Sequence, residues 1–367
     1  MRRRSMIFCW IAIWVAIAIS SHRAIADQSI WLSAPQQKRL VELVQNDPVA
    51  AALYGEYKRA ADRALTSEPN PIDAILTEGK LPQDPAKLKT EASLGDMPKI
   101  GALGYVFVVS ADAKYADKAR EFILAWARTN HSAGDPIDDT NLEPLIVTYD
   151  LTRYTFSPDE RAIVDRYLRE VVAAELATAK SKKNNHYNNW HSHRLKIVGL
   201  IAFTLHDQAL IDETARLYKE QIDHNIEADG STYDFHERDA LHYHIYDIAP
   251  LLTLAIVAHN NGVDLYSYRS ASGATLKIAV DFLLPYARGI KTHAEFVNSK
   301  VSFDRKRAEA GAKAYQAGSP FQPGSATSIL AVAEFFDPSL LELVQTLSHK
   351  PAQKYPSWQS VLNAVWR

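Results

Sequence analysis

Apolar residues recur at every third or fourth position over most of the chain, which is the spacing of amphipathic α-helices. This pattern predicts helices over residues 49–65, 100–109, 113–129, 240–259 and 275–287. Strand-like alternation is confined to Glu295–Phe303, and the sequence has no fixed-period repeat. Many helices of similar length joined by short turns are typical of antiparallel helical hairpins. We therefore expect an all-α protein, built as an (α/α) toroid, an incomplete barrel, or a solenoid.

Capping residues mark several of the expected helix starts. The stretch Ser157–Glu160 has Ser, Pro and Glu at the N-cap, N1 and N3 positions of a capping box. Thr140–Glu143 has the same Thr-to-Glu spacing and predicts another helix start. Ser67–Asp84, rich in Pro, Asp and Glu, interrupts the helical pattern. Its segment Glu78–Pro82 is predicted to be a linker, with an active-site lid as the alternative.

The N-terminus has the three parts of a secretory signal peptide. Basic residues at Arg2–Arg4 precede the apolar run Met6–Ile19, and Ala24–Ala26 forms a small-x-small cleavage site. The apolar run is too short to span a bilayer comfortably, so a retained anchor is only the alternative. The sequence predicts a periplasmic or secreted protein, cleaved after Ala26 and free of the membrane thereafter. Residues 27–367 are expected to form a single toroidal domain, two domains being the alternative.

Composition narrows the classes of function. The only cysteine, Cys9, lies in the predicted signal, so the mature chain would have no disulfide, cysteine–metal site or cysteine nucleophile. Cleavage would remove four arginines, which lowers Lys+Arg from 41 to 37 against 43 Asp+Glu, a net charge of about −6. This charge argues against nucleic acid as a partner, because nucleic-acid-binding proteins carry a basic stripe. An anionic substrate would have to be bound by local groups.

A dense polar cluster, Lys182–Arg194, lies just before the apolar run of a predicted helix. It holds four Asn, three His, one Tyr and one Trp, whereas a helix start needs one capping side chain. If one of its first two asparagines is that cap, His186, Trp190 and Arg194 fall four apart on one stripe. With the free N–H groups of the helix start, these side chains would cradle a carboxylate, such as that of a uronic acid. A set of ordinary caps is the alternative.

A second cluster, His236–Asp247, has the same character, and we expect the two helix ends to face each other across a cleft. Arg238, His242 and Tyr246 are again four apart. Pro250 cannot donate to the carbonyl of Tyr246, which predicts a kink near that residue. Half-buried core tyrosines in this cluster are the alternative.

A third region, Lys291–Arg307, mixes Lys300 and the basic residues Arg305–Arg307 with Asn298 and two phenylalanines. It is interpreted as a positive wall for sugar carboxylates, or else as a solvated basic face.

Two other chemistries have weaker signals. The pairs His191-x-His193 and His242-x-His244 have chelating spacing in a loop, but side chains two apart diverge on a helix. We therefore predict no metal site. Three acidic residues within 234–239 offer the paired carboxylates of a glycoside hydrolase. A nucleophile elbow, a phosphate loop and a dinucleotide fingerprint are absent.

At the first two clusters the chain resembles the alginate lyase family. Asn184-Asn185-His186, followed by Trp190, is similar to the family's Asn-Asn-His motif with a Trp shortly after it. Ala240–Tyr246, which runs into Pro250-Leu251, is similar to the family's Ala-Leu-x-Tyr-His-x-Tyr helix, and the Asn261–Leu265 turn is also similar. The likeness covers roughly residues 90–330. It implies an all-α toroid that cleaves a uronate polysaccharide by β-elimination, with no cofactor.

The resemblance also implies roles for individual residues. Asn185 and His186 would neutralise the substrate carboxylate, and His186 is a candidate base. Tyr246 would be the general acid and is a second candidate base. The family's arginine falls at Asp239 in this chain, so Arg238, one place earlier, is the candidate for its role. The further predicted substrate contacts are Trp190, His191, Arg194, His242, Tyr243, His244, Asn298 and Lys300.

The sequence therefore predicts a polysaccharide lyase acting on an anionic polymer such as alginate. A glycoside hydrolase on a similar toroid and a non-catalytic polysaccharide-binding protein are the alternatives. Mannuronate, guluronate and glucuronate all remain candidate sugars, and no oligomeric state is predicted.

Overall fold

The computed structural model describes residues 29–180 and 187–367. The predicted signal peptide and the predicted site residues Asn185 and His186 lie outside these ranges.

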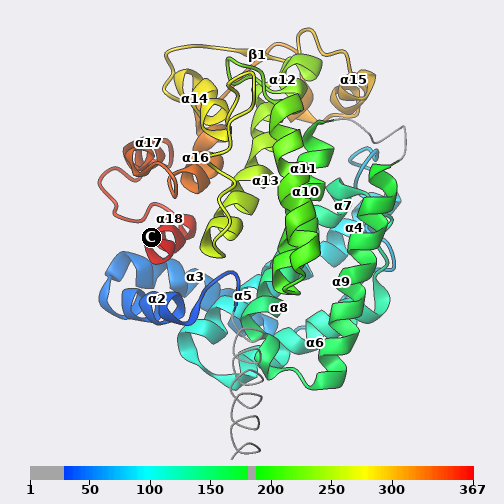
Figure 1. Ribbon diagram of the computed structural model, residues 1–367, viewed down its shortest axis with the longest axis vertical. Helices are drawn as coiled ribbons and strands as arrows, with labels where there is room; N and C mark the ends of the chain where they lie inside the picture. The colour runs from blue at the N-terminus through cyan, green and yellow to red at the C-terminus, as the bar shows by residue number, and fades with distance from the viewer. Residues whose placement is uncertain (1–28, 181–186) are drawn as a thin grey trace, which may run out of the picture.

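Seven helices of the described chain form an inner ring (Figure 1). Each packs against the next, and the last returns to the first. In chain order they are α3 (Pro48–Ala64), α5 (Asp96–Ser110), α8 (Glu143–Thr152), α10 (Asn189–Thr204), α13 (Leu241–Asn260), α16 (Thr327–Ala333) and α18 (Trp358–Trp366). The helices that pack outside this ring are α2 (Ala34–Asn46), α6 (Ala113–Thr129), α9 (Pro158–Ala179), α11 (Gln208–Asn225), α14 (Leu276–Ala287) and α17 (Leu341–Leu347). This is an (α/α) toroid, so the predicted fold class is confirmed.

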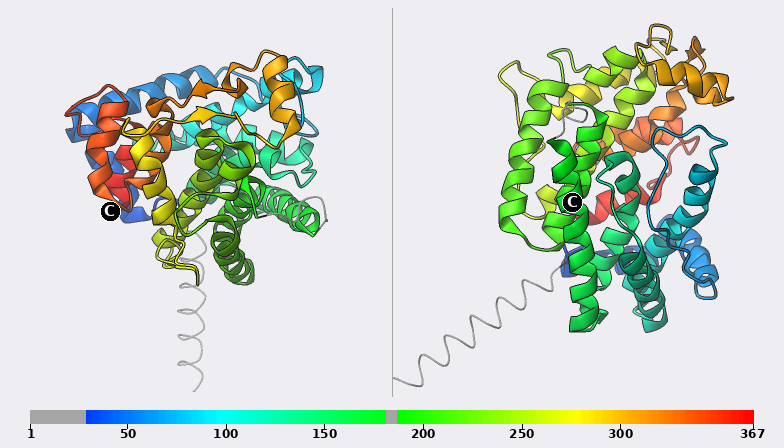
Figure 2. Two further views of the ribbon diagram at one scale, coloured as in Figure 1. Left: turned by 90° about the horizontal axis from the view of Figure 1, so that it is seen from above. Right: turned by 90° about the vertical axis from the view of Figure 1, so that its right-hand side faces the viewer.

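Short elements gather at one end of the molecule, while α2 and α3 lie toward the other (Figures 1 and 2). The gathered elements include α12 (Tyr233–Arg238), α15 (Ser302–Glu309) and the antiparallel strands β1 (Ala294–Glu295) and β2 (Ser319–Pro320). The other short helices are α4 (Pro85–Leu94), α7 (Pro136–Asp139) and the 3₁₀ turns Thr140–Leu142, Arg153–Thr155, Lys313–Tyr315, Pro323–Ala326 and Pro338–Leu340. The segment Glu295–Phe303, expected to be a strand or an extended loop, is strand only at Glu295, continues as turns and loop, and enters α15 at Ser302.

The two ends of the described chain meet and close the ring. The indole nitrogen of Trp366 donates to the main-chain oxygen of Trp31 at 2.8 Å, and the two rings pack edge to face with centroids 5.2 Å apart. Asp150 of α8 accepts hydrogen bonds from the main-chain N–H groups of Ile30 and Trp31 at 3.0 and 3.1 Å. The first described residues thus tie α8 to α18.

Helix α13 is the most central element of the toroid. It is long and apolar enough to cross a membrane, but 72% of its apolar window is buried inside the protein. It packs against α10, α12, α14 and α16. Its hydrophobicity is therefore that of a core helix.

The capping predictions have different outcomes. Ser157 and Glu160 form the expected reciprocal box at the start of α9. At Thr140–Glu143 a helix does start, since α8 begins at Glu143, but no capping box forms, because Thr140 opens a 3₁₀ turn before it. Its polar side chains turn to α10 instead: Thr140 bonds His193, and Glu143 pairs with Lys196.

Candidate functional site

The start of α10 differs from the expectation. The side chain of Asn188 accepts from the N–H of Trp190 at 3.1 Å, so the helix begins at Asn189 rather than beside Asn184 or Asn185. The N–H of Asn189 donates to Asp234 of α12 at 2.6 Å. The hydroxyl of Ser192 donates to Asp247 at 2.6 Å, and this bond joins the two predicted polar clusters.

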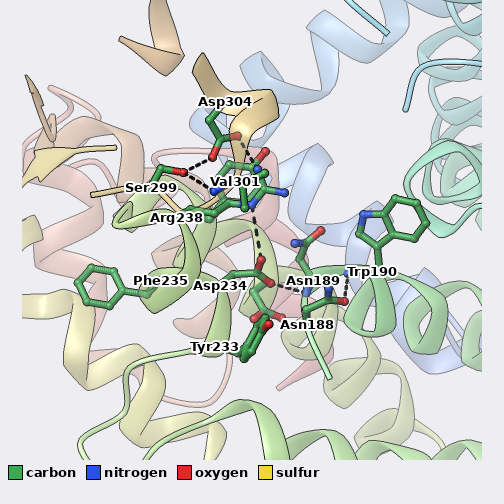
Figure 3. A network of polar contacts seen from close by, with 12 residues as sticks. Asn188, Asn189, Trp190, Tyr233, Asp234, Phe235, Arg238, Ser299, Val301 and Asp304 are labelled. Atoms are coloured by element: carbon green, nitrogen blue, oxygen red, sulfur yellow. Dashed lines mark hydrogen bonds and ion pairs between the residues drawn. The ribbon is translucent and has the colours of Figure 1, made fainter. Parts of the chain in front are cut away.

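Arg238 is held in a network of carboxylates (Figure 3). Its guanidinium bonds Asp304 of α15 at 2.5 Å, lies 3.7 Å from Asp234 and stands 3.8 Å above the ring of Tyr243. Asp239 has a left-handed φ of 50° and separates α12 from α13. The predicted stripe of Arg238, His242 and Tyr246 on one helix is therefore wrong.

The start of α13 is fixed by a carboxylate from β1. Glu295 accepts from the N–H groups of Leu241 and His242 at 2.9 and 3.0 Å, which satisfies two free donors of the helix. His242 is exposed at this end of α13. Desolvation by the surrounding side chains lowers the pKa of His242, and the charges of Arg238 and Arg307 lower it further.

Tyr246 lies at the wall of a cavity of about 590 Å³ on α13. Residues lining this cavity include His242, Glu295, Lys313 and Phe321. Burial raises the pKa of Tyr246, and the nearby Glu78 raises it further, whereas Arg307 lowers it. At neutral pH the phenol therefore keeps its proton.

His193 lies directly against Tyr246, with ring centroids 4.3 Å apart. Its Nδ1 is 2.9 Å from the hydroxyl of Thr140, and its Nε2 has no hydrogen-bond partner among the described residues. Burial, with the charge of Lys196 as a second cause, holds the pKa of His193 well below its usual range, so the imidazole is neutral. In the sequence, the spacing of His193 suggests only a metal ligand, because local spacing does not show that His193 meets Tyr246.

Three of the predicted substrate contacts point elsewhere. Arg194 is buried and its Nε pairs with Glu175 of α9 at 2.9 Å. His191 lines a different cavity, of about 530 Å³, between α9, α10 and α11, and burial lowers its pKa to about 4. His244 is fully buried and its Nε2 is 2.9 Å from the carbonyl oxygen of Ala279. The structure does not bring these side chains to Tyr246.

The remaining predicted contacts lie around the carboxylate network. Trp190 is half-buried and its indole points away from the ion pairs (Figure 3). Asn298 donates twice to Asp239, each time at 2.9 Å, and Lys300 pairs with Glu237 at 3.0 Å. Tyr243 is buried, and its hydroxyl accepts a hydrogen bond from Arg307 at 2.9 Å.

The loop of residues 67–84 reaches the same place through Glu78. Asp138 of α7 accepts from the N–H groups of Thr77 and Glu78 at 2.7 and 3.0 Å, which anchors the loop. The carboxylate of Glu78 lies 3.6 Å from the guanidinium of Arg307. The sequence pattern predicts Arg307 as part of a positive wall, but it does not predict the contact with Glu78.

Comparison with known proteins agrees with this architecture. A sequence model described as "Alginate lyase" matches residues 36–293, well over half of the chain. The chain belongs to the alginate lyase family. A curated polysaccharide lyase from Stenotrophomonas maltophilia (strain K279a) is 28% identical over 179 residues, which are 45% of this chain. The match spans 53% of that relative's length, about half of it.

Solved structures share the fold of this alginate lyase family member. An alginate lyase from Bacteroides ovatus superposes with a TM-score of 0.68 at 19% identity, covering 92% of this chain and 98% of that one. An alginate lyase from Sphingomonas species A1 gives 0.60 at 20% identity, covering 87% and 92%. Another structure, of an alginate lyase variant in complex with a tetrasaccharide, also gives 0.60, at 18% identity, covering 85% and 90%.

Within residues 29–180 and 187–367 of this alginate lyase family member, no group of three or more His, Cys, Asp or Glu side chains is placed to hold a metal ion. The pairs His191-x-His193 and His242-x-His244 each lie on a helix, where side chains two residues apart point in different directions.

Proposed function

We propose that this protein is a polysaccharide lyase that cleaves a uronate-containing polysaccharide, such as alginate, by β-elimination. The observation that carries the proposal is Tyr246, a protonated phenol at the wall of a sugar-sized cavity in an alginate lyase toroid. The tetrasaccharide complex of a fold relative supports an oligosaccharide as the occupant of such a cavity.

The chemistry requires three functions. A base removes the proton next to the carboxylate, an acid protonates the leaving oxygen, and donors stabilise the charge that develops on the carboxylate. Tyr246 suits the acid, because burial keeps its proton in place. His186 remains the proposed base and Asn185 a proposed carboxylate donor, on the resemblance alone. Where the two reacting groups lie on the same sugar face, Tyr246 performs both proton transfers only as a phenolate stabilised by a cation, and Arg307 is the cation that lowers its pKa.

A hydrolase is less well supported by the positions of the acidic residues. Asp234 is bonded to Asn189 and lies beside Arg238, and Asp239 accepts from Asn298. Neither carboxylate lines the cavity at Tyr246. A pair of carboxylates flanking a glycosidic bond is what a hydrolase needs.

The assay that decides the reaction uses polymannuronate, polyguluronate and polyglucuronate. A lyase leaves a 4,5-unsaturated sugar end, so ultraviolet absorbance should rise with at least one polymer, and a chelator should leave the rate unchanged. New reducing ends without absorbance would establish the hydrolase instead. Binding without any cleavage would establish a carbohydrate-binding protein, and a chelator-inactivated enzyme restored by zinc would contradict the metal-free mechanism.

We also propose export to the periplasm, on the N-terminal pattern alone. N-terminal sequencing of protein recovered from that compartment should begin at Asp27. A chain that still begins at Met1 and fractionates with membranes would show a retained anchor.

A further inference from the structure

The cationic side chains near Tyr246 differ in how fully their charge is neutralised. Arg238 is enclosed by Asp304, Asp234 and the ring of Tyr243. Lys196 pairs with Glu143 at 2.5 Å and is buried. Neither cation is available to a carboxylate that enters the cavity.

Arg307 is in a different position. Its Nη1 donates to the hydroxyl of Tyr243 at 2.9 Å, and its guanidinium carbon lies 4.5 and 4.9 Å from the ring centres of Phe303 and Tyr315. These rings orient the planar group and shield it from water, since 13% of its side chain is exposed. The two carboxylates beside it, Glu78 and Asp304, are at 3.6 and 3.8 Å, beyond a hydrogen bond.

Asp304 is already committed to other donors. It accepts from Arg238 at 2.5 Å and from Ser299 at 2.7 Å. Arg307 therefore has N–H donors in excess of the acceptors that its surroundings supply. A guanidinium of this kind matches a carboxylate by two parallel hydrogen bonds.

Glu78 places a carboxylate at this guanidinium from a separate part of the chain. Its main chain is fixed by Asp138, and its carboxylate contacts Arg307 at ion-pair distance, 3.6 Å, without a hydrogen bond to it. Both charges act on the same phenol, because Arg307 lowers and Glu78 raises the pKa of Tyr246. Arg307 donates to the hydroxyl of Tyr243, whose ring centre lies 6.2 Å from that of Tyr246, so the pair lies near the proposed reacting group.

We propose that Arg307 binds the uronate carboxylate of the substrate, and that Glu78 occupies this place until the substrate displaces it. This inference rests on the proposed lyase function and names the group that recognises the sugar acid. A polymer of neutral sugars has no group to displace Glu78, so the exchange makes the site selective for uronates.

The test compares Arg307→Ala, Arg307→Lys and Glu78→Gln on the polyuronate that the wild-type protein cleaves fastest. Arg307→Ala should lower kcat/KM by about 10²-fold, as expected for loss of one donor to a developing charge. Arg307→Lys should recover part of that loss, because it keeps the charge without the bidentate fork. Glu78→Gln should lower KM by roughly three- to tenfold, since a neutral amide competes less well for the guanidinium. Glu309→Ala, an exposed change at the end of the same helix and outside the basic region, is the control and should match the wild type.

A second measurement separates recognition from structural support. Sodium glucuronate should inhibit the wild-type protein more strongly than glucose does, and Arg307→Ala should remove that difference. Circular dichroism checks that each variant folds. If Arg307→Ala does not fold, the comparison uses Arg307→Lys instead.

The outcomes separate the two proposals. If no polyuronate gives an unsaturated product, the lyase function fails, and this inference fails with it. If the wild-type protein is a lyase but Arg307→Lys and Arg307→Ala stay within threefold of its kcat/KM, or Glu78→Gln raises KM, only this inference is overturned.

Discussion

Tyr246→Phe should lower the rate of elimination by about 10²–10⁴-fold, the usual contribution of a general acid or base. The change removes one hydroxyl and keeps the ring that packs on His193 and Tyr243. The protein should therefore fold as the wild type does and still bind an oligouronate. Ultraviolet absorbance measures the rate. Thermal denaturation measures the stability of the fold, and calorimetric titration with a saturated tetrauronate measures binding.

Tyr243→Phe is the matched control, because it makes the same change one helical turn earlier. It removes the hydroxyl that accepts from Arg307, so a loss of about tenfold is expected, from one hydrogen bond to a charged group. Full activity in Tyr246→Phe would remove this phenol from the mechanism. Equal losses in the two variants would show that the hydroxyls only support the cleft.

Arg194→Ala should lower the free energy of unfolding by about 3–5 kcal/mol, the cost of breaking a buried ion pair by removing one partner. Arg194 is 1% exposed and its partner Glu175 is fully buried. The change leaves the carboxyl groups of Glu175 and Asp139 together without the cation that lies beside them. Urea denaturation at pH 7 measures the loss.

A neutral pair is the control for this prediction. Arg194→Met combined with Asp139→Asn removes the cation and the carboxylate that stays charged beside a protonated Glu175, and should recover most of the stability. Burial, and then Asp139, raise the pKa of Glu175 to about 9 from 4.5. The folded protein therefore binds this proton more tightly than the unfolded chain, so stability from Glu175 falls as pH rises between 4.5 and 9. Glu175→Gln should lose that pH dependence, and a single Arg194→Ala variant as stable as the wild type would contradict the account.

The sequence predicts what depends on neighbours in the chain. Helical spacing and the capping box at Ser157 are local, and the toroid follows from stacking such hairpins. The left-handed residue Asp239 has no local signature, since it is not a glycine, and it breaks the stripe expected on α13.

The site itself depends on contacts between distant segments. His193 meets Tyr246 because α10 packs on α13, and Glu78 meets Arg307 because a loop crosses to α15. The spacing of apolar residues along the chain carries no information about which distant side chains meet. The roles given to Asn185 and His186 stay predictions, carried by the resemblance.

The contact between Trp31 and Trp366 determines when folding can finish. These residues are separated by nearly the whole chain, yet together they complete the inner ring. During synthesis the first helices emerge long before α18 exists, so their inner faces lack the last neighbour until translation ends. Such a closure joins segments of very large sequence separation, so we expect it to be the last and slowest step of assembly.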